Sequence, residues 1–165
     1  MIQSSDMDIY FKHLDSPLGK ITLTANNTAL LAVWFESHRI PSLAQATLSP
    51  EHPILKLGEQ QLTEYFNGQR QQFSLPMAFQ GTDFQQRVWQ ALTTIPYGET
   101  WHYQQLADAI ENPKACRAVG TANGKNSLSI IVPCHRVITK NGDLGGYAGG
   151  SDIKQKLLDL ERQFK

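Results

Sequence analysis

The residues of this sequence best suited to chemistry are Cys134 and His135, which are adjacent and follow Pro133. A thiol is a useful nucleophile only as the thiolate, which a neighbouring base or a positive field must favour. Adjacent residues of an extended segment point to opposite faces, so His135 is not automatically the base for Cys134. The pattern leaves two interpretations open: a cysteine nucleophile, and a buried structural cysteine, which is the commonest fate of a free cysteine.

A metal site is a weaker interpretation of the same residues. Cys116, Cys134 and His135 do not have the spacing of zinc ligands, and no CxxC or HxxxH pattern occurs. With only two cysteines the chain has no disulfide framework, which indicates a reducing setting. No apolar run approaches the roughly 20 residues that cross a bilayer. We therefore expect a cytoplasmic protein without a metal ion or a membrane partner.

Charge gives an independent indication of a partner. The chain of 165 residues has 15 basic and 15 acidic side chains, yet no carboxylate occurs between Glu111 and Asp143. That stretch contains five basic residues, Lys114, Arg117, Lys125, Arg136 and Lys140. On charge alone, such a run indicates a polyanion partner about as well as it indicates a solvated basic face.

Short helices are predicted to position the basic run. The pattern Thr82-x-x-Gln85 is a capping box that opens a helix. A second short helix is expected over residues 103–110, and Asn112-Pro113 would supply the N-cap and first residue of a third. Two short helices joined by about three residues are a helix-turn-helix candidate, although packed helical hairpins that bind no DNA are commoner.

The cysteine is expected to follow a buried strand. Residues 130–132 are fully apolar and predict a strand that ends at Pro133. Residues 145–150 contain four glycines and predict a loop. Ser151 should cap a last helix, whose apolar face would carry Ile153, Leu157, Leu160 and Phe164.

The first half of the chain predicts a small sheet. Apolar and polar residues alternate in residues 9–14 and 21–25, which indicates a hairpin, and the apolar run 30–35 would add a third antiparallel strand. Residues 54–66 suit a helix, and residues 73–79 a short strand before a linker.

Taken together, these motifs resemble the O6-alkylguanine-DNA alkyltransferase (methylated-DNA–protein-cysteine methyltransferase) family, in its short bacterial-type form without a regulatory domain. The most specific part is the run Ile-Val-Pro-Cys-His-Arg-Val-Ile at residues 131–138. Supporting motifs occur in family order at residues 103–107, 117–120, 122–123 and 146–150.

The resemblance implies an α+β fold in two domains. Residues 1–80 would form an N-terminal supporting domain with a small antiparallel sheet of ribonuclease-H-like type. Residues 81–165 would form a mainly helical, winged helix-turn-helix-like domain with the DNA-binding and active sites. Some relatives bind structural zinc in the N-terminal domain, but residues 1–82 contain no cysteine, so we expect none.

The resemblance also implies a reaction that needs no cofactor. A flipped O6-alkylguanine in double-stranded DNA would give its alkyl group irreversibly to Cys134, once per molecule, with O4-alkylthymine left open as a second substrate. His135 would take the thiol proton through a water, and Glu161 would orient His135. Tyr103 would give a proton to the leaving guanine, and Asn126 would anchor the thiol.

Further residues are implied in DNA binding. Arg117 would insert where the flipped nucleotide had been stacked. The backbone of Val132 and the segment at Tyr147 and Ala148 would line the base pocket. Phosphate contacts are expected from Lys114, Lys125 and Arg136. The protein is expected to be a monomer in solution, with cooperative assembly on DNA left open.

The sequence departs from the family pattern at three positions, and it leaves two rival functions open. Ser127 stands where members commonly have proline, Ser129 stands where some members have a second proline, and His102 replaces a usual serine or threonine before Tyr103. A non-catalytic binder of alkylated DNA would share the helix-turn-helix and the arginine but would lack Cys134. A cysteine hydrolase would instead form an acyl-enzyme and turn over repeatedly.

Overall fold

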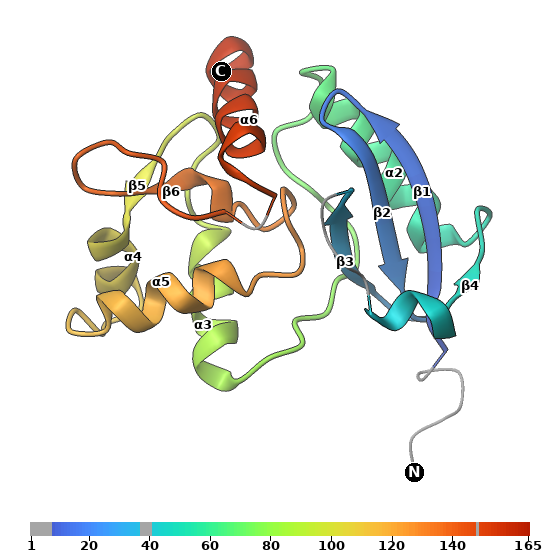
Figure 1. Ribbon diagram of the computed structural model, residues 1–165, viewed down its shortest axis with the longest axis horizontal. Helices are drawn as coiled ribbons and strands as arrows, with labels where there is room; N and C mark the ends of the chain where they lie inside the picture. The colour runs from blue at the N-terminus through green and yellow to red at the C-terminus, as the bar shows by residue number, and fades with distance from the viewer. Residues whose placement is uncertain (1–7, 37–40, 148) are drawn as a thin grey trace. The chain divides into compact units, whose positions relative to one another are not determined.

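The structure is a computed structural model that describes residues 8–36, 41–147 and 149–165 (Figure 1). The chain divides into two compact units, the first running to Ala78 and the second from Phe79 to Lys165.

The first unit is a four-stranded sheet with one long helix. Its strands are β1 (Tyr10–Ser16), β2 (Gly19–Ala25), β3 (Leu30–Phe35) and β4 (Thr47–Leu48), in the order β3-β2-β1-β4. Strands β1, β2 and β3 form the predicted antiparallel meander, whereas β4 pairs with β1 in parallel and was not predicted. A 3-10 helix, η1 (Pro41–Gln45), precedes β4.

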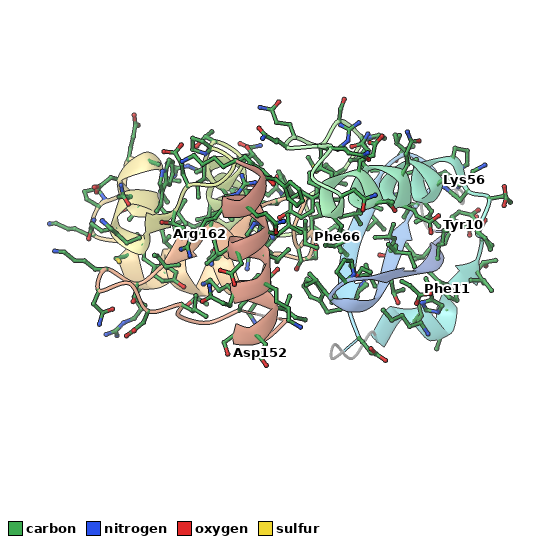
Figure 2. All side chains as sticks on the ribbon, turned by 90° about the horizontal axis from the view of Figure 1, so that it is seen from above. Tyr10, Phe11, Lys56, Phe66, Asp152 and Arg162 are labelled. Carbon is green, nitrogen blue, oxygen red and sulfur yellow. The ribbon has the colours of Figure 1, made fainter. Side chains whose placement is uncertain are left out.

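Helix α2 (Pro53–Phe66) packs on the sheet, as the views in Figures 1 and 2 agree. His52 begins the helix by accepting a hydrogen bond from the amide of Ile54. A Cβ atom at Gly58 would lie 3.1 Å from a methyl carbon of Leu23, so the glycine permits a close approach to β2. Tyr10 lies at the start of β1 and Lys56 in the first turns of α2 (Figure 2).

The strand predicted over residues 73–79 is reduced to one bridge in the structure, between Met77 and Leu30. The amide of Leu30 donates to the Pro76 carbonyl at 2.9 Å, and the amide of Ala78 donates to the Leu30 carbonyl at 3.0 Å. Pro76 has no N–H to extend the pairing, which explains why the strand is not longer.

The second unit consists of short helices around a two-stranded parallel ladder. In chain order it contains α3 (Asp83–Leu92), β5 (Trp101–His102), α4 (Tyr103–Ala109), α5 (Cys116–Gly124), the 3-10 helix η2 (Cys134–Arg136), β6 (Val137–Ile138) and α6 (Ser151–Phe164). Strands β5 and β6 pair in parallel (Figure 1).

Two helix starts in this unit follow their sequence signals. The predicted capping box opens α3, with Thr82 Oγ1 accepting from the Gln85 amide and Gln85 Oε1 accepting from the Thr82 amide. At α4 the residue before the helix is His102, and Gln105 Oε1 accepts a hydrogen bond from its backbone N–H at 2.9 Å. A glutamine three residues into each helix thus satisfies the amide at the cap.

The predicted start of the third helix is wrong. Helix α5 begins at Cys116 rather than beside Pro113, and residues 110–115 separate it from α4. The amide of Ala115 donates to the Asn112 carbonyl, which closes a turn where the sequence suggested a first helical turn. Lys114 therefore lies in the connection, whereas Arg117 lies on the helix.

The predicted strand at residues 130–132 is also wrong. Ile130 has φ of 73°, and the amide of Val132 donates to the Leu128 carbonyl at 2.9 Å, so the segment turns tightly instead of extending. Its apolar side chains are nevertheless buried, because a run without polar residues can fill a core in either conformation.

Helix α6 buries a face that shares Leu157 with the predicted one but otherwise differs from it. Ser151 is its first residue and Gly150, with φ of 96°, occupies the N-cap position. Its buried residues are Lys154, Leu157, Leu158 and Glu161. Phe164 is 37 % exposed, and Asp152 and Arg162 lie on exposed parts of the helix (Figure 2). Two ionisable side chains, Lys154 and Glu161, therefore lie on the buried face together with two leucines.

Candidate active site

Cys134 begins the 3-10 helix η2, directly after the tight turn, and its side chain is buried at 4 % exposure. Asn126, which follows α5, donates its amide Nδ2–H to the Cys134 sulfur at 3.3 Å and to the Val132 carbonyl at 2.9 Å. Its Oδ1 accepts from the Leu128 amide at 3.0 Å. One asparagine thus fixes both the turn and the thiol, as the expected anchor would.

The backbone of Val132 is already hydrogen-bonded within the protein. Val132 is fully buried, and its carbonyl oxygen accepts hydrogen bonds from Asn126 Nδ2 and from the Cys134 amide. The expectation that the Val132 backbone lines a base pocket is therefore not supported, because both lone pairs of this carbonyl have donors within the protein.

His135 and Glu161 form a buried pair. His135 Nε2 lies 2.6 Å from Glu161 Oε2, and neither side chain is more than 1 % exposed. The contact joins η2 to α6 across 26 positions of sequence. Helix α6 therefore brings a carboxylate to the residue next to the thiol.

Arg136 holds the same carboxylate from the other side. Its Nε donates to Glu161 Oε1 at 2.8 Å, its Nη2 donates to Oε2 at 3.0 Å, and its Nη1 donates to the Ile95 carbonyl at 2.7 Å. The guanidinium also lies over the Tyr97 ring, 5.5 Å from its centroid. The expected role of Arg136 as a phosphate contact is wrong, because its side chain is buried and bonded to Glu161.

The charges of this cluster fix the proton positions. Hydrogen bonds from His135 and Arg136 outweigh burial and hold the pKa of Glu161 far below its ordinary value, so it is a carboxylate at neutral pH. Burial lowers the pKa of His135, so its imidazole is neutral. A carboxylate only accepts, so Nε2 must carry the His135 proton and Nδ1 the lone pair. Nδ1 is buried and has no hydrogen-bond partner among the described residues.

The thiol itself is not activated by its surroundings alone. Burial raises the pKa of Cys134, while the Asn126 hydrogen bond and the charge of Lys154 oppose the rise. A thiol in this state needs a base at the moment of attack, and the free Nδ1 of His135 is a base of suitable type.

Tyr103 is the first residue of α4 and packs between two glycines. Its ring lies 3.6 Å from the position of a Cβ at Gly120, and its hydroxyl only 2.9 Å from that of a Cβ at Gly145. Burial raises the pKa of Tyr103, and the nearby thiols of Cys134 and Cys116 raise it further. The phenol therefore keeps its proton at neutral pH, in a position near Cys134.

Tyr147 lies in the glycine-rich loop and also near the thiol. Burial raises its pKa well above the ordinary value, a negative charge at Cys134 would raise it further, and a hydrogen bond with Ser129 opposes the rise. Ala148, the other loop residue expected in the pocket, lies outside the described residues.

The remaining basic residues of the run are on the surface. Lys114, Arg117, Lys125 and Lys140 are exposed, and none of them forms an ion pair within the part of the chain that the structure describes. Arg117 projects from the exposed side of α5, next to Ala118. The structure thus separates the expected basic set into four exposed cations and the buried Arg136.

Sequence reasoning missed one residue of this site, Lys154. It is fully buried and donates from Nζ to main-chain carbonyls. A signal was present in the sequence, since Lys154 precedes Leu157, Leu158 and Glu161 by three, four and seven positions, which places it on their helical face. Lysines are so seldom buried that the spacing was not taken as a sign of burial.

The described residues hold neither a candidate metal site nor a candidate membrane span. They contain no group of three or more histidine, cysteine, aspartate or glutamate side chains that could hold a metal ion. Within the same residues, no helix is both long and apolar enough to span a membrane.

Family models match both units of the chain. Residues 83–163 match the DNA binding domain of 6-O-methylguanine DNA methyltransferase, and residues 9–79 match its ribonuclease-like domain. The chain belongs to the 6-O-methylguanine DNA methyltransferase family. The family inferred from the sequence motifs and the α+β fold are confirmed.

Individual members of the family are similar over nearly their whole length. The methylated-DNA–protein-cysteine methyltransferase of Mycobacterium tuberculosis is 46% identical over 155 residues, which cover 93% of each chain. The constitutive enzyme of that name from Bacillus subtilis is 45% identical over 157 residues, covering 93% of this chain and 95% of the relative.

Solved structures show the same relationship. The crystal structure of Mycobacterium tuberculosis O6-methylguanine methyltransferase has a TM-score of 0.89 and 44% identity, covering 95% of this chain and 94% of the other. The structure of the protein from that organism in complex with DNA has a TM-score of 0.88 and 43% identity, covering 94% of both chains.

The buried cluster of this methyltransferase family member predicts a large stability effect for Glu161→Gln. The substitution keeps the size of the side chain but leaves the Arg136 guanidinium buried without an anion, which should cost about 3–5 kcal/mol of unfolding free energy at pH 7. Because the pKa of Glu161 is lowered in the folded state, its contribution is present above its ordinary value of 4.5 and is lost as pH falls below it.

Urea unfolding at pH 7 and pH 3 checks this prediction. The difference in unfolding free energy between wild type and Glu161→Gln should be largest at pH 7 and should shrink in acid. Glu64→Gln is the control, because Glu64 pairs with Arg70 at a partly exposed site and should lose less than about 1 kcal/mol. Equal losses for the two variants would contradict the view that the Glu161 cluster is a tightly coupled buried network.

Proposed function

We propose that this chain repairs double-stranded DNA by transferring the alkyl group of a flipped O6-alkylguanine to the sulfur of Cys134, once per molecule. The observation that carries the proposal is the contact set around the thiol: an Asn126 amide on the sulfur, and a neutral His135 held by an ionised Glu161. The relatives named for this reaction support it, and so does the homologous complex with DNA.

In the proposed reaction the sulfur attacks the alkyl carbon, an S–C bond forms and the bond from that carbon to O6 breaks. His135 takes the thiol proton at Nδ1, through a water, and Glu161 stabilises the imidazolium that results. Tyr103 gives its proton to guanine as it leaves, which avoids the release of a guanine anion. His135 thus gains one proton and Tyr103 loses one, and exchange with solvent returns both groups to their starting protonation states.

The product limits the protein to one event. Alkyl transfer makes a thioether, and none of the groups proposed at this site provides a way to hydrolyse a C–S bond. The alkylated cysteine therefore stays, and the protein acts as a reagent rather than as a recycling catalyst. The same attack would remove the alkyl group of O4-alkylthymine, which presents an alkyl carbon on an exocyclic oxygen of the base in the same way.

DNA contact is proposed for the exposed cations. Arg117 on α5 would fill the stack left by the flipped nucleotide, since a guanidinium can stack and hydrogen-bond together. Lys114, Lys125 and Lys140 would contact phosphates without reading sequence. The protein would act as a monomer in the cytoplasm.

The mass of the protein tests the proposed reaction. After incubation with excess O6-benzylguanine, the protein should gain one benzyl group per chain, and peptide mapping should place it on Cys134. Cys134→Ser should gain nothing, while Cys116→Ser, in which a half-buried cysteine is replaced, should gain one group like wild type. No added mass would support a lesion binder, and repeated turnover without retained mass would support a hydrolase; either result would overturn the proposal.

The pH dependence of the rate tests His135 as the base. The single-turnover rate of wild type should be roughly level between about pH 7 and pH 9, because the pKa of His135 is lowered and the base is already neutral. In His135→Gln, which can still donate to Glu161 but cannot take the proton, only the thiolate can react. Its rate should rise about tenfold per pH unit in this range, because burial raises the pKa of Cys134. Profiles of the same shape would exclude His135 as the base.

A comparison of two substrates tests Arg117. Arg117→Ala should slow repair of a duplex that contains O6-methylguanine by about tenfold or more, since extrusion of a base costs a few kcal/mol. Reaction with free O6-benzylguanine needs no extrusion and should be unchanged. Lys125→Ala is the control, because it should weaken binding to any duplex and leave the rate at saturating DNA as in wild type. Equal losses on both substrates would assign Arg117 to the fold instead.

A further inference from the structure

Lys154 is a lysine in an unusual setting, on the buried face of α6 with no exposed surface. Its Nζ donates hydrogen bonds to three main-chain carbonyls, at 2.6 Å to Val137, at 3.3 Å to Gly146, and to Leu144. All three acceptors belong to the segment that runs from β6 through the glycine-rich loop.

The burial of this ammonium group is costly and is not offset by a carboxylate. Lys154 forms no ion pair with any carboxylate of the described residues. A methionine would fill a similar volume on this helical face without being desolvated as a charge. Three carbonyl acceptors match the three N–H groups of a protonated lysine, so the main chain takes the place of a counter-ion.

Protonation is consistent with this arrangement at neutral pH. Burial lowers the pKa of Lys154 from 10.5 to about 8, and a negative charge at Cys134 opposes the shift. The ammonium form therefore predominates at pH 7. Lys154 interacts electrostatically with two titratable groups, Cys134 and His135 of η2, and its positive charge lowers the pKa of each.

The loop has other anchors at its ends but not in its middle. Thr139 and Asp143 close the turn before it, with the Thr139 amide donating to the Asp143 carbonyl at 2.9 Å. At the far end, the Gly150 amide donates to the Tyr147 carbonyl at 3.0 Å. Among the described side chains, Lys154 alone bonds to residues 144–146.

This middle part of the loop lies against the proposed proton donor. Gly145, whose two neighbours Leu144 and Gly146 each give a carbonyl to Lys154, has φ of 72° and would place a Cβ 2.9 Å from the Tyr103 hydroxyl. The next residue but one is Tyr147, whose phenol lies near Cys134. A shift of this segment would therefore move the surroundings of both phenols.

We propose that Lys154 is a positioning residue, which holds residues 144–147 against Tyr103 so that the site for the base is formed before the base arrives. The inference rests on the proposed function and adds to it the group that organises the pocket. Pre-organisation of this kind lowers the cost of ordering the loop when a substrate binds.

Two reagents separate positioning from other roles of Lys154. O6-benzylguanine must be held as a base, whereas iodoacetamide alkylates Cys134 without a base site. In Lys154→Met, the concentration of O6-benzylguanine that gives half of the maximal single-turnover rate should rise about tenfold or more, because three hydrogen bonds from a charged donor are lost. The rate of alkylation of Cys134 by iodoacetamide at pH 7 reports the effect of the lost Lys154 charge on the thiol. This rate should fall by less than about threefold, since the thiol, Asn126 and His135 remain in place.

Two further variants complete the experiment. Lys154→Gln keeps N–H donors without the charge, so it should recover part of the O6-benzylguanine affinity. Lys156→Met is the matched control on the same helix, because Lys156 is exposed, and it should behave as wild type. Unfolding temperatures of all variants are compared, and Lys154→Met should stay folded because it no longer buries a charge.

Three results would overturn the inference. Equal losses with O6-benzylguanine and iodoacetamide would show that Lys154 acts on the thiol by its charge and not on the loop. An unchanged half-saturating concentration in Lys154→Met would show that the loop needs no anchor. If Lys154→Met unfolds, Lys154→Gln takes its place in the test. A wild-type affinity of Lys154→Gln for O6-benzylguanine would then show that the loop needs no charged anchor. Absence of transfer in wild type would instead reject the proposed function.

Discussion

The site depends on one buried carboxylate. Glu161 accepts hydrogen bonds from His135, from two nitrogens of Arg136 and, at 3.3 Å, from the amide of Gly98. Its negative charge compensates the buried guanidinium, and it forces the His135 proton onto Nε2. A single group thus connects α6, η2 and the turn before β5, and it also sets the protonation state of the residue beside the thiol.

Sequence patterns predicted the parts of the fold that local chemistry decides. The capping box at Thr82 and the meander of the first unit follow from hydrogen-bonding side chains and from alternation, which act over a few residues. The helix start predicted at Asn112-Pro113 was wrong because the same two residues also suit a turn. The strand predicted over residues 130–132 was wrong because apolar composition predicts burial and does not determine the backbone conformation.

The residues predicted for the site, such as Cys134, His135 and Glu161, came from the resemblance to the family. Nothing local distinguishes Arg136 from the exposed cations of its run, since its burial depends on Glu161, which lies 25 residues further along the chain. Lys154 was missed for a related reason, because a charge is normally a sign of exposure. The burial of Arg136 could be found only from its long-range contacts, whereas the helical spacing of Lys154 indicated its face without showing which carbonyls would accept its hydrogen bonds.

Helix α6 supplies both Glu161 and Lys154, and it therefore behaves as one unit for the chemistry of the site. Proteins open in cooperative segments, and a terminal helix is a common one. When α6 detaches, His135 loses its orienting carboxylate and the glycine-rich loop loses its central anchor at the same moment. A partly opened molecule would then keep the thiol of Cys134 but would lack both the oriented base and the ordered loop beside it.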